Sequence, residues 1–230
     1  MGDGQTKVYP AVIPGGVAIP EVTCAALMVK SLTVIAENEF SEAKDVSCQP
    51  GGKFLLAAKR SKDGLWVALQ VIPRVGYKDE LKRGKPRRQI LGLRMAGNQP
   101  LYVGWPENPA DNRPRVCWGD SEGKPYDAVN SDELQWPDGE PLYLASLAGG
   151  EFVVRGTREG KLYSEIIPPL LFVAGRPLYR ARFNRKMHLV WGEAESRPCD
   201  DISVPTVEGK MIMACAAEGT KIYSLTIKTA

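Results

Sequence analysis

The chain has 230 residues, of which 43% are hydrophobic, and a formal net charge of +3. A chain of this size can bury a sizeable core, either as one large domain or as two small ones. It has no apolar run long enough for a membrane-spanning helix and no apolar leader near its N-terminus, so we expect neither a membrane protein nor a secreted one. Its five cysteines are irregularly spaced, which is typical of free thiols in a reducing compartment and favours the cytoplasm.

Three sequence markers recur along the chain in a fixed order. The first is an apolar residue that ends a turn, and it occurs at Val12, Val46, Leu81, Val129, Ile166 and Ile202. The second is a glycine before an apolar strand, at Gly52, Gly97, Gly139, Gly175 and Gly209. The third is a β-rich segment, at 32–36, 66–70, 115–119, 152–156, 188–192 and 222–226. Self-similarity at a period of about 36 residues is the signature of a repeated supersecondary unit.

Each repeat predicts three or four short strands separated by Gly, Pro, Asp and Asn turns, and no segment has convincing helical periodicity. A sheet this small cannot bury both of its faces alone, but radial stacking lets each sheet cover its neighbours. We therefore expect an all-β fold, a six-bladed β-propeller formed by residues 7–230, with 1–6 a disordered start or a cloning remnant. A strand at Val8–Val12 would complete the last blade and close the ring without an unpaired edge.

Two groups of residues resemble a known family. Trp136-Pro-Asp-Gly-Glu140 and Gln49-Pro-Gly-Gly-Lys53 introduce strands as in the TolB-type propeller repeat. Val190-Trp-Gly192 and Pro125-Tyr-Asp-Ala-Val129 are similar to the strand end and Tyr-Asp turn that follow in those repeats. The resemblance covers nearly the whole chain and implies a propeller with a protein-contact or accessory role.

The residues needed for catalysis or metal binding are sparse. The only histidine, His188, lies within a predicted strand, where a structural role is the simpler interpretation. There is no Gly-x-Ser-x-Gly elbow, no Cys-x-x-Cys or paired-His spacing and no glycine-rich phosphate loop. Acid pairs such as Asp200-Asp201 fall on the repeated turn, where their side chains bond local backbone amides. We therefore expect a protein that is not an enzyme and that uses no metal or cofactor.

Positive charge is concentrated in one place. Residues 74–94 hold eight Lys or Arg and two acidic residues, a local charge of +6 that leaves −3 for the rest of the chain. The unit between Leu81 and Val129 is longer than its neighbours, with extra length at 82–89 and at 105–114. Lengthened loops on a regular scaffold are common binding sites. The predicted contact residues are Lys82, Arg83, Lys85, Arg87, Arg88, Trp105 and Arg113.

This basic segment has two interpretations: a solvated turn that aids solubility, or a surface that binds an acidic protein. Nucleic acid is disfavoured because no aromatic residues are interleaved between Lys82 and Gln89 for base stacking. Trp105 is the best candidate for an exposed interface anchor. We predict a monomeric, non-catalytic interaction module. The alternatives are a carbohydrate- or small-ligand-binding propeller and an accessory propeller domain of a larger enzyme.

Overall fold

The computed structural model describes residues 39–49, 53–72 and 80–229, and the chain divides into two compact units, Met1–Asn112 and Arg113–Ala230. Each unit is described separately. The described residues form antiparallel sheets and contain no α-helix, which confirms the all-β prediction. A closed propeller is not seen among them, and the predicted closing strand at Val8–Val12 lies outside the described residues.

The first unit contains the complete first sheet. Its strand order is β1 (Phe40–Gln49), β2 (Lys53–Arg60), β3 (Trp66–Ile72) and β4 (Glu80–Arg83). Next along the chain come β5 (Gln89–Ala96) and β6 (Gln99–Trp105), which pair with each other. These two strands begin the second sheet, and the boundary between the units follows β6.

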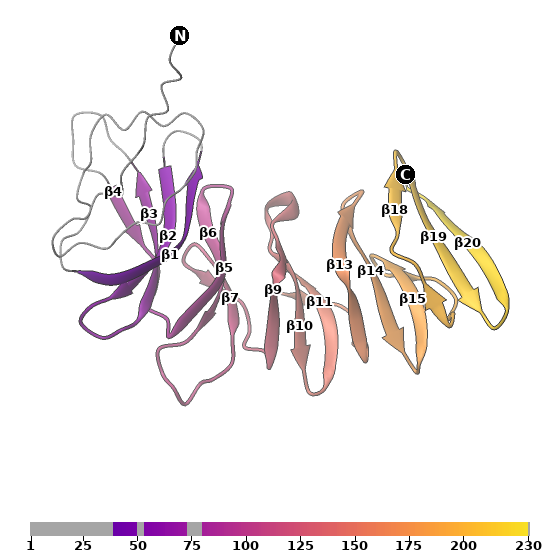
Figure 1. Cartoon of the computed structure of the whole chain (residues 1–230), viewed down its shortest axis with the longest axis horizontal. Coiled ribbons are helices and arrows are strands. Elements are labelled where there is room, and N and C mark those ends of the chain that lie inside the picture. The colour runs from indigo at the N-terminus through magenta and orange to yellow at the C-terminus, as the bar shows by residue number, and fades with distance from the viewer. Residues whose placement is uncertain (1–38, 50–52, 73–79, 230) are drawn as a thin grey trace, which may run out of the picture. The chain divides into compact units, whose positions relative to one another are not determined.

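The second unit begins with the short strands β7 (Arg115–Trp118) and β8 (Ser121–Glu122). The third sheet consists of β9 (Ala128–Gln135), β10 (Leu142–Leu147), β11 (Gly150–Arg155) and β12 (Arg158–Glu159), with one 3₁₀ turn at Pro137–Gly139. The fourth consists of β13 (Glu165–Val173), β14 (Arg176–Phe183), β15 (Lys186–Trp191) and β16 (Ala194–Glu195). In the fifth, β17 (Asp201–Ile202), β18 (Thr206–Glu208) and β20 (Lys221–Lys228) all pair with β19 (Met211–Glu218). Figure 1 shows the main strands of these three sheets following one another along the second unit.

Backbone geometry explains the recurring glycine marker. Gly97, Gly139, Gly175 and Gly209 have φ values of 60°, 81°, 75° and 58° and lie in the turns β5–β6, β9–β10, β13–β14 and β18–β19. A Cβ added at any of them meets no atom within 4 Å. The left-handed conformation, and not a lack of space, therefore favours glycine here. Gly52 lies outside the described residues.

The prediction that Leu81 occupies the same place in the repeat as Val129, Ile166 and Ile202 is wrong. Leu81 lies on β4, the fourth strand of the first sheet, where it pairs with Val71. The position equivalent to Val129, Ile166 and Ile202, the second residue of a first strand, is Ile90. Leu81 resembles the marker because Lys78 and Asp79 precede it in the sequence. Val46, which directly follows Lys44 and Asp45, is also misplaced, because it lies in the middle of β1 and is not its second residue.

Two apolar cores lie between neighbouring sheets of the second unit. One joins the third and fourth sheets through Leu144, Val153, Ile166 and Tyr179, among other residues. The other joins the fourth and fifth sheets, and its members include Leu178, Leu189, Ile212 and Ala214. Because neighbouring residues of a strand point to opposite faces, Leu178 and Tyr179 place one side chain in each core. The fourth sheet is therefore covered on both faces.

A repeated junction links each sheet to the next one along the chain. The residue two positions before a first strand exchanges backbone hydrogen bonds with a third strand: Tyr163 with Glu151 (2.9 Å in both directions) and Cys199 with Met187 (2.9 and 2.8 Å). In the first unit Arg87 exchanges bonds of 2.8 and 2.7 Å with Trp66. Tyr126, two positions before β9, makes a single such bond, from its N to Pro114 O at 3.1 Å, just before β7. The side chains of Arg87, Tyr126, Tyr163 and Cys199 are all buried.

Two of the junction tyrosines also reach a glutamate on a short fourth strand. Tyr163 Oη donates to Glu195 Oε1 at 2.6 Å, and Tyr126 Oη donates to Glu159 Oε1 at 3.1 Å. Burial raises the pKa of Tyr126 to about 12 and raises that of Tyr163 still further, so both phenols remain protonated donors. Burial opposes ionisation of Glu195, but hydrogen bonds from Lys161 and Tyr163 outweigh it and lower the pKa of that carboxyl.

Candidate functional site

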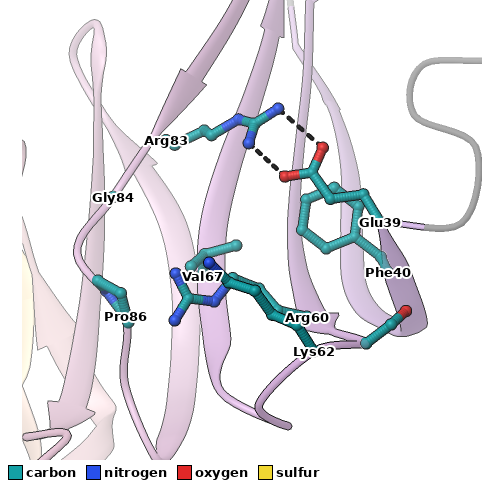
Figure 2. A pocket seen from close by; sticks show the side chains of 9 residues that line it. Glu39, Phe40, Arg60, Lys62, Val67, Arg83, Gly84 and Pro86 are labelled. Atoms are coloured by element: carbon teal, nitrogen blue, oxygen red, sulfur yellow. Dashed lines mark hydrogen bonds and ion pairs between the residues drawn. The ribbon is translucent and has the colours of Figure 1, made fainter.

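A pocket of about 560 Å³ lies within the first unit. Its wall comes from three segments: the start of β1, the β2–β3 turn with the beginning of β3, and the end of β4 with the residues after it. Figure 2 shows the side chains around it. The lining residues are Glu39, Phe40, Arg60, Ser61, Lys62, Val67, Arg83, Gly84 and Pro86.

The strand register brings these segments together. β3 pairs with β2 on one side and with β4 on the other. Gly84 N donates to Ala68 O at 2.8 Å, which continues the β3–β4 pairing beyond the end of β4. The chain after β4 therefore runs beside the beginning of β3, close to the turn that carries Arg60 and Lys62.

Arg83 and Glu39 face each other at the pocket. Arg83 Nη2 donates to Glu39 Oε2 at 3.0 Å, and Arg83 Nη1 donates to Glu39 Oε1. Their side chains are 47% and 36% exposed, so water screens the pair. The guanidinium carbon of Arg83 lies 6.0 Å from the centre of the Phe40 ring, at the edge of cation–π range.

A second guanidinium–carboxylate pair holds the β2–β3 turn. Arg60 Nε donates to Asp63 Oδ1 at 3.0 Å, and Arg60 Nη2 donates to Asp63 Oδ2. Asp63 Oδ1 also accepts from Leu65 N at 3.1 Å. The hydrogen bond from Arg60 lowers the pKa of the Asp63 carboxyl, which stays ionised at neutral pH. Lys62, at the tip of the turn, makes no ion pair with the described residues.

The charge balance of this pocket is positive. Its lining has three cations, Arg60, Lys62 and Arg83, against one carboxylate, Glu39. Asp63 neutralises Arg60 from outside the lining. Lys62 therefore carries a positive charge that is not compensated, and exposed Lys82 and Lys85 lie on either side of Arg83 and Gly84 in the sequence.

The seven predicted contact residues differ in their exposure and in their contacts. Lys82, Arg83 and Lys85 are exposed, as the prediction requires. Arg87 is only 4% exposed, so its inclusion in an exposed contact surface is corrected. The physical reason is the junction: Arg87 occupies the position where other sheets have Tyr126, Tyr163 and Cys199. Its stem packs over Gly104, where an added Cβ would lie 3.1 Å from Arg87 Cδ.

Arg88 anchors the inserted loop. Its Nε donates to Pro106 O at 2.9 Å, and its Nη2 donates to Asp111 O at 3.3 Å and to Asn112 Oδ1 at 3.0 Å. Trp105 is the last residue of β6 and is partly buried, whereas it was predicted to lie in the loop itself. Arg113 is exposed and belongs to the second unit.

Of the residues that line the pocket, the predicted contact set contains only Arg83; the charged and aromatic ones that it missed are Glu39, Phe40, Arg60 and Lys62. The turn Arg60-Ser-Lys-Asp-Gly64 offered a signal, because Asp-Gly between two apolar strands predicts a hairpin. The pairing of both neighbours with β3 would then place that turn beside the residues after β4. Glu39 and Phe40 gave no comparable signal.

His188 is buried in the second unit, where it lies beside two polar groups of the chain that follows its strand. Its Nδ1 lies 3.3 Å from Ser196 O and 3.8 Å from Glu195 Oε2. Ser196 Oγ accepts from Leu189 N at 3.0 Å and donates to Arg197 O at 2.9 Å, so its proton is directed at backbone. These contacts support a structural role for the histidine. Among residues 39–49, 53–72 and 80–229, no three His, Cys, Asp or Glu side chains gather as a metal site would require.

Comparison of the chain with protein-family models, with curated proteins and with solved structures gives no match. In the part of the chain that the structure describes, no helix has the length and apolar character needed to cross a membrane.

Proposed function

We propose that this chain is a six-bladed propeller-type module that binds an acidic segment of a protein partner without catalysing a reaction. Support for the propeller comes from sheets that repeat one strand order, one junction and, in the second unit, apolar cores between neighbours. The sixth blade and its closing strand at Val8–Val12 would come from the first 38 residues. The same architecture is what the resemblance to TolB-type repeats implies.

The observation that carries the binding function is the pocket beside the basic segment. Arg60, Lys62 and Arg83 line it, and exposed Lys85 follows Gly84 of the lining, whereas Lys82, next to Arg83 on β4, belongs to the opposite face of the sheet. Lys and Arg at the rim of a contact surface attract acidic partners and increase the association rate, and salt screens this effect. The pocket and the exposed cations Arg83 and Lys85 beside it therefore form one proposed contact surface.

Charge reversal tests this function. The triple variant Lys62→Glu, Arg83→Glu, Lys85→Glu should bind a labelled ten-residue peptide of Glu and Gly with one central Leu about tenfold or more weakly, with a shallower salt dependence. The measurement is fluorescence anisotropy over a range of salt concentrations, with Gln in place of Glu as the peptide control. The matched protein control is Arg158→Glu, Arg185→Glu, Lys210→Glu, three exposed cations of the second unit. Equal losses in the two triple variants would mean that net charge alone drives binding, and would overturn the proposed surface.

The size of the pocket favours a small anionic ligand as the alternative to a peptide. Pockets for small ligands occupy roughly 300–1,000 Å³, and this one has about 560 Å³. A small anionic ligand would use the same cations, whereas a sugar would find one aromatic lining residue, Phe40. Competition by a small dicarboxylate at millimolar concentration separates the alternatives: complete displacement of the peptide favours the small ligand, and no displacement favours the peptide.

A further inference from the structure

We propose that Glu39 competes with the acidic partner for Arg83: the Glu39 carboxylate binds the Arg83 guanidinium until a carboxylate of the partner displaces it. This inference rests on the proposed function and specifies how the site is regulated. The two-point contact between Glu39 and Arg83 is the geometry in which arginine binds a carboxylate ligand. Glu39 therefore already makes the contact that an acidic side chain of the partner would make (Figure 2).

The Glu39–Arg83 pair is the one that can exchange. Both of its side chains are substantially exposed, and exposed ion pairs contribute little to stability. The Arg60–Asp63 pair is less exposed, at 20% and 30%, and Asp63 also accepts from the backbone of its own turn. A ligand that displaced Asp63 would disturb the turn, whereas one that displaced Glu39 would disturb only a side chain.

The backbone around Glu39 supports this exchange. Glu39 O accepts from Ser61 N at 2.9 Å, which fixes the main chain at the start of β1 independently of the carboxylate. The next residue, Phe40, is buried, at 8% exposed, and belongs to an apolar cluster with Ala58, Val67 and Leu69. The Glu39 side chain can therefore rotate away from Arg83 while the strand that carries it stays in place.

Arg83 has a second contact that remains after the carboxylate leaves. The Phe40 ring lies 6.0 Å from its guanidinium carbon, and an aromatic face favours a cation nearby. Phe40, Val67 and Pro86 add apolar surface to the lining. The ligand class that fits is an acidic peptide in which an Asp or Glu that binds Arg83 is followed by an apolar side chain.

The test compares two glutamates of the same strand region. Glu39→Gln and Glu42→Gln each remove one negative charge and one exposed ion pair, because Glu42 binds Lys59 Nζ at 2.7 Å. If Glu39 competes with the ligand, Glu39→Gln should bind the acidic peptide about two- to fivefold more tightly, and Glu42→Gln should bind it like the unmodified chain. The gain should disappear in the double variant Glu39→Gln, Arg83→Gln.

Each outcome has a distinct meaning. Equal affinities of Glu39→Gln and Glu42→Gln, whether raised or unchanged, would overturn the competitor role and leave the proposed function standing. Peptide binding that is absent, or insensitive to Arg83→Gln in the otherwise unmodified chain, would overturn the proposed function and this inference with it. Thermal unfolding of all four variants controls for folding, and the exposed ion pairs predict only small changes.

Discussion

Tyr163 holds two neighbouring sheets of the second unit together. Its backbone pairs with Glu151 of the third sheet, and its hydroxyl donates to Glu195 of the fourth. Its ring meets Tyr179 edge-on, with the centroids 6.0 Å apart. One residue thus contributes backbone, aromatic and polar contacts to a single junction, and its raised pKa keeps it a donor throughout the physiological range.

Tyr163→Phe should lower the free energy of unfolding by about 1–3 kcal/mol, because a charge-assisted hydrogen bond is lost from a partly buried carboxylate. Urea denaturation measures the change. The pKa of Glu195 is lowered in the folded state from its ordinary 4.5. The stabilisation is therefore present above that value and is lost as the pH falls through the folded pKa, so the cost of the variant should shrink in acid.

Tyr126→Phe is the matched control for this change. Its hydroxyl makes the same bond to Glu159, but the distance is longer and the Glu159 side chain is 32% exposed, against 24% for Glu195. We expect a smaller loss of stability from this variant. A Tyr163→Phe protein as stable as the unmodified chain at neutral pH would contradict the assigned role.

The burial of Arg87 could not be predicted by counting charges along the sequence. Counting charge correctly predicted the exposure of Lys82, Arg83 and Lys85, but it treats every arginine alike. Arg87 is buried because of its place in the repeat, two residues before a first strand, as are Tyr126 and Tyr163. An alignment of the repeats on Ile90 would have predicted this burial; the alignment on Leu81 could not.

At the scale of elements, the sequence predicted strands and turns well and the repeat boundaries less well. Glycine markers predicted four of the turns, because their backbone has positive φ. The fourth strands left almost no pattern, since β8, β12 and β16 have only two residues each. The sequence therefore does not distinguish clearly between a fourth strand and the first strand of the next sheet. For this reason Leu81, which lies on β4, was taken for the marker of the following first strand, β5. The pocket was missed for a related reason, because it depends on which segments pair with β3.

Arg88 gives an element-scale prediction. Its guanidinium holds the inserted loop through three acceptors, Pro106 O, Asp111 O and Asn112 Oδ1. Arg88→Ala should therefore raise amide exchange and proteolytic cleavage within 106–112, while the β5–β6 hairpin stays protected, because its backbone pairing does not use this side chain. Hydrogen-exchange mass spectrometry measures both regions.

Lys82→Ala is the control for this loop experiment. Lys82 is exposed and lies on β4, paired with Gln70, so its removal should leave exchange in 106–112 unchanged. If Arg88→Ala leaves the loop as protected as before, the loop is held by its own turns, such as the Ala110 N to Asn108 Oδ1 bond of 3.0 Å, and not by Arg88.

At the scale of the whole molecule, the fifth sheet indicates what a complete assembly requires. One face of β19 presents Ile212, Ala214 and Ala216 to the apolar core shared with the fourth sheet. The alternate residues are apolar too, yet Met211 is 43% exposed and Cys215 is also exposed. Sheets that are covered on both faces have strands of this composition, as β14 of the fourth sheet does with Leu178 and Tyr179. The outer face of β19 therefore has the composition of a covered surface.

The edge of the fifth sheet leads to the same conclusion. Among the described residues β20 pairs only with β19, whereas the third strands β3, β11 and β15 each have a fourth strand beyond them. Ile222, on β20, is 80% exposed. Long apolar edges promote aggregation unless another strand pairs with them. In the proposed propeller, segments 22–28 and 32–36 would cover the outer face of β19, and Val8–Val12 would pair with the edge of β20.

Deletion of residues 1–38 tests this proposal. If they supply the sixth blade, the shortened chain should aggregate more readily and exchange the amides of β19 and β20 faster, because an apolar face and a strand edge would lose their cover. Deletion of residues 1–6 alone, the segment expected to be a disordered start, should change neither property. Exchange in β19 and β20 that is equally slow in the full chain and in both shortened chains would mean that the fifth sheet needs no further strand. That result would contradict the proposed closed propeller. The binding surface on the first sheet would still be tested by Glu39→Gln and Glu42→Gln.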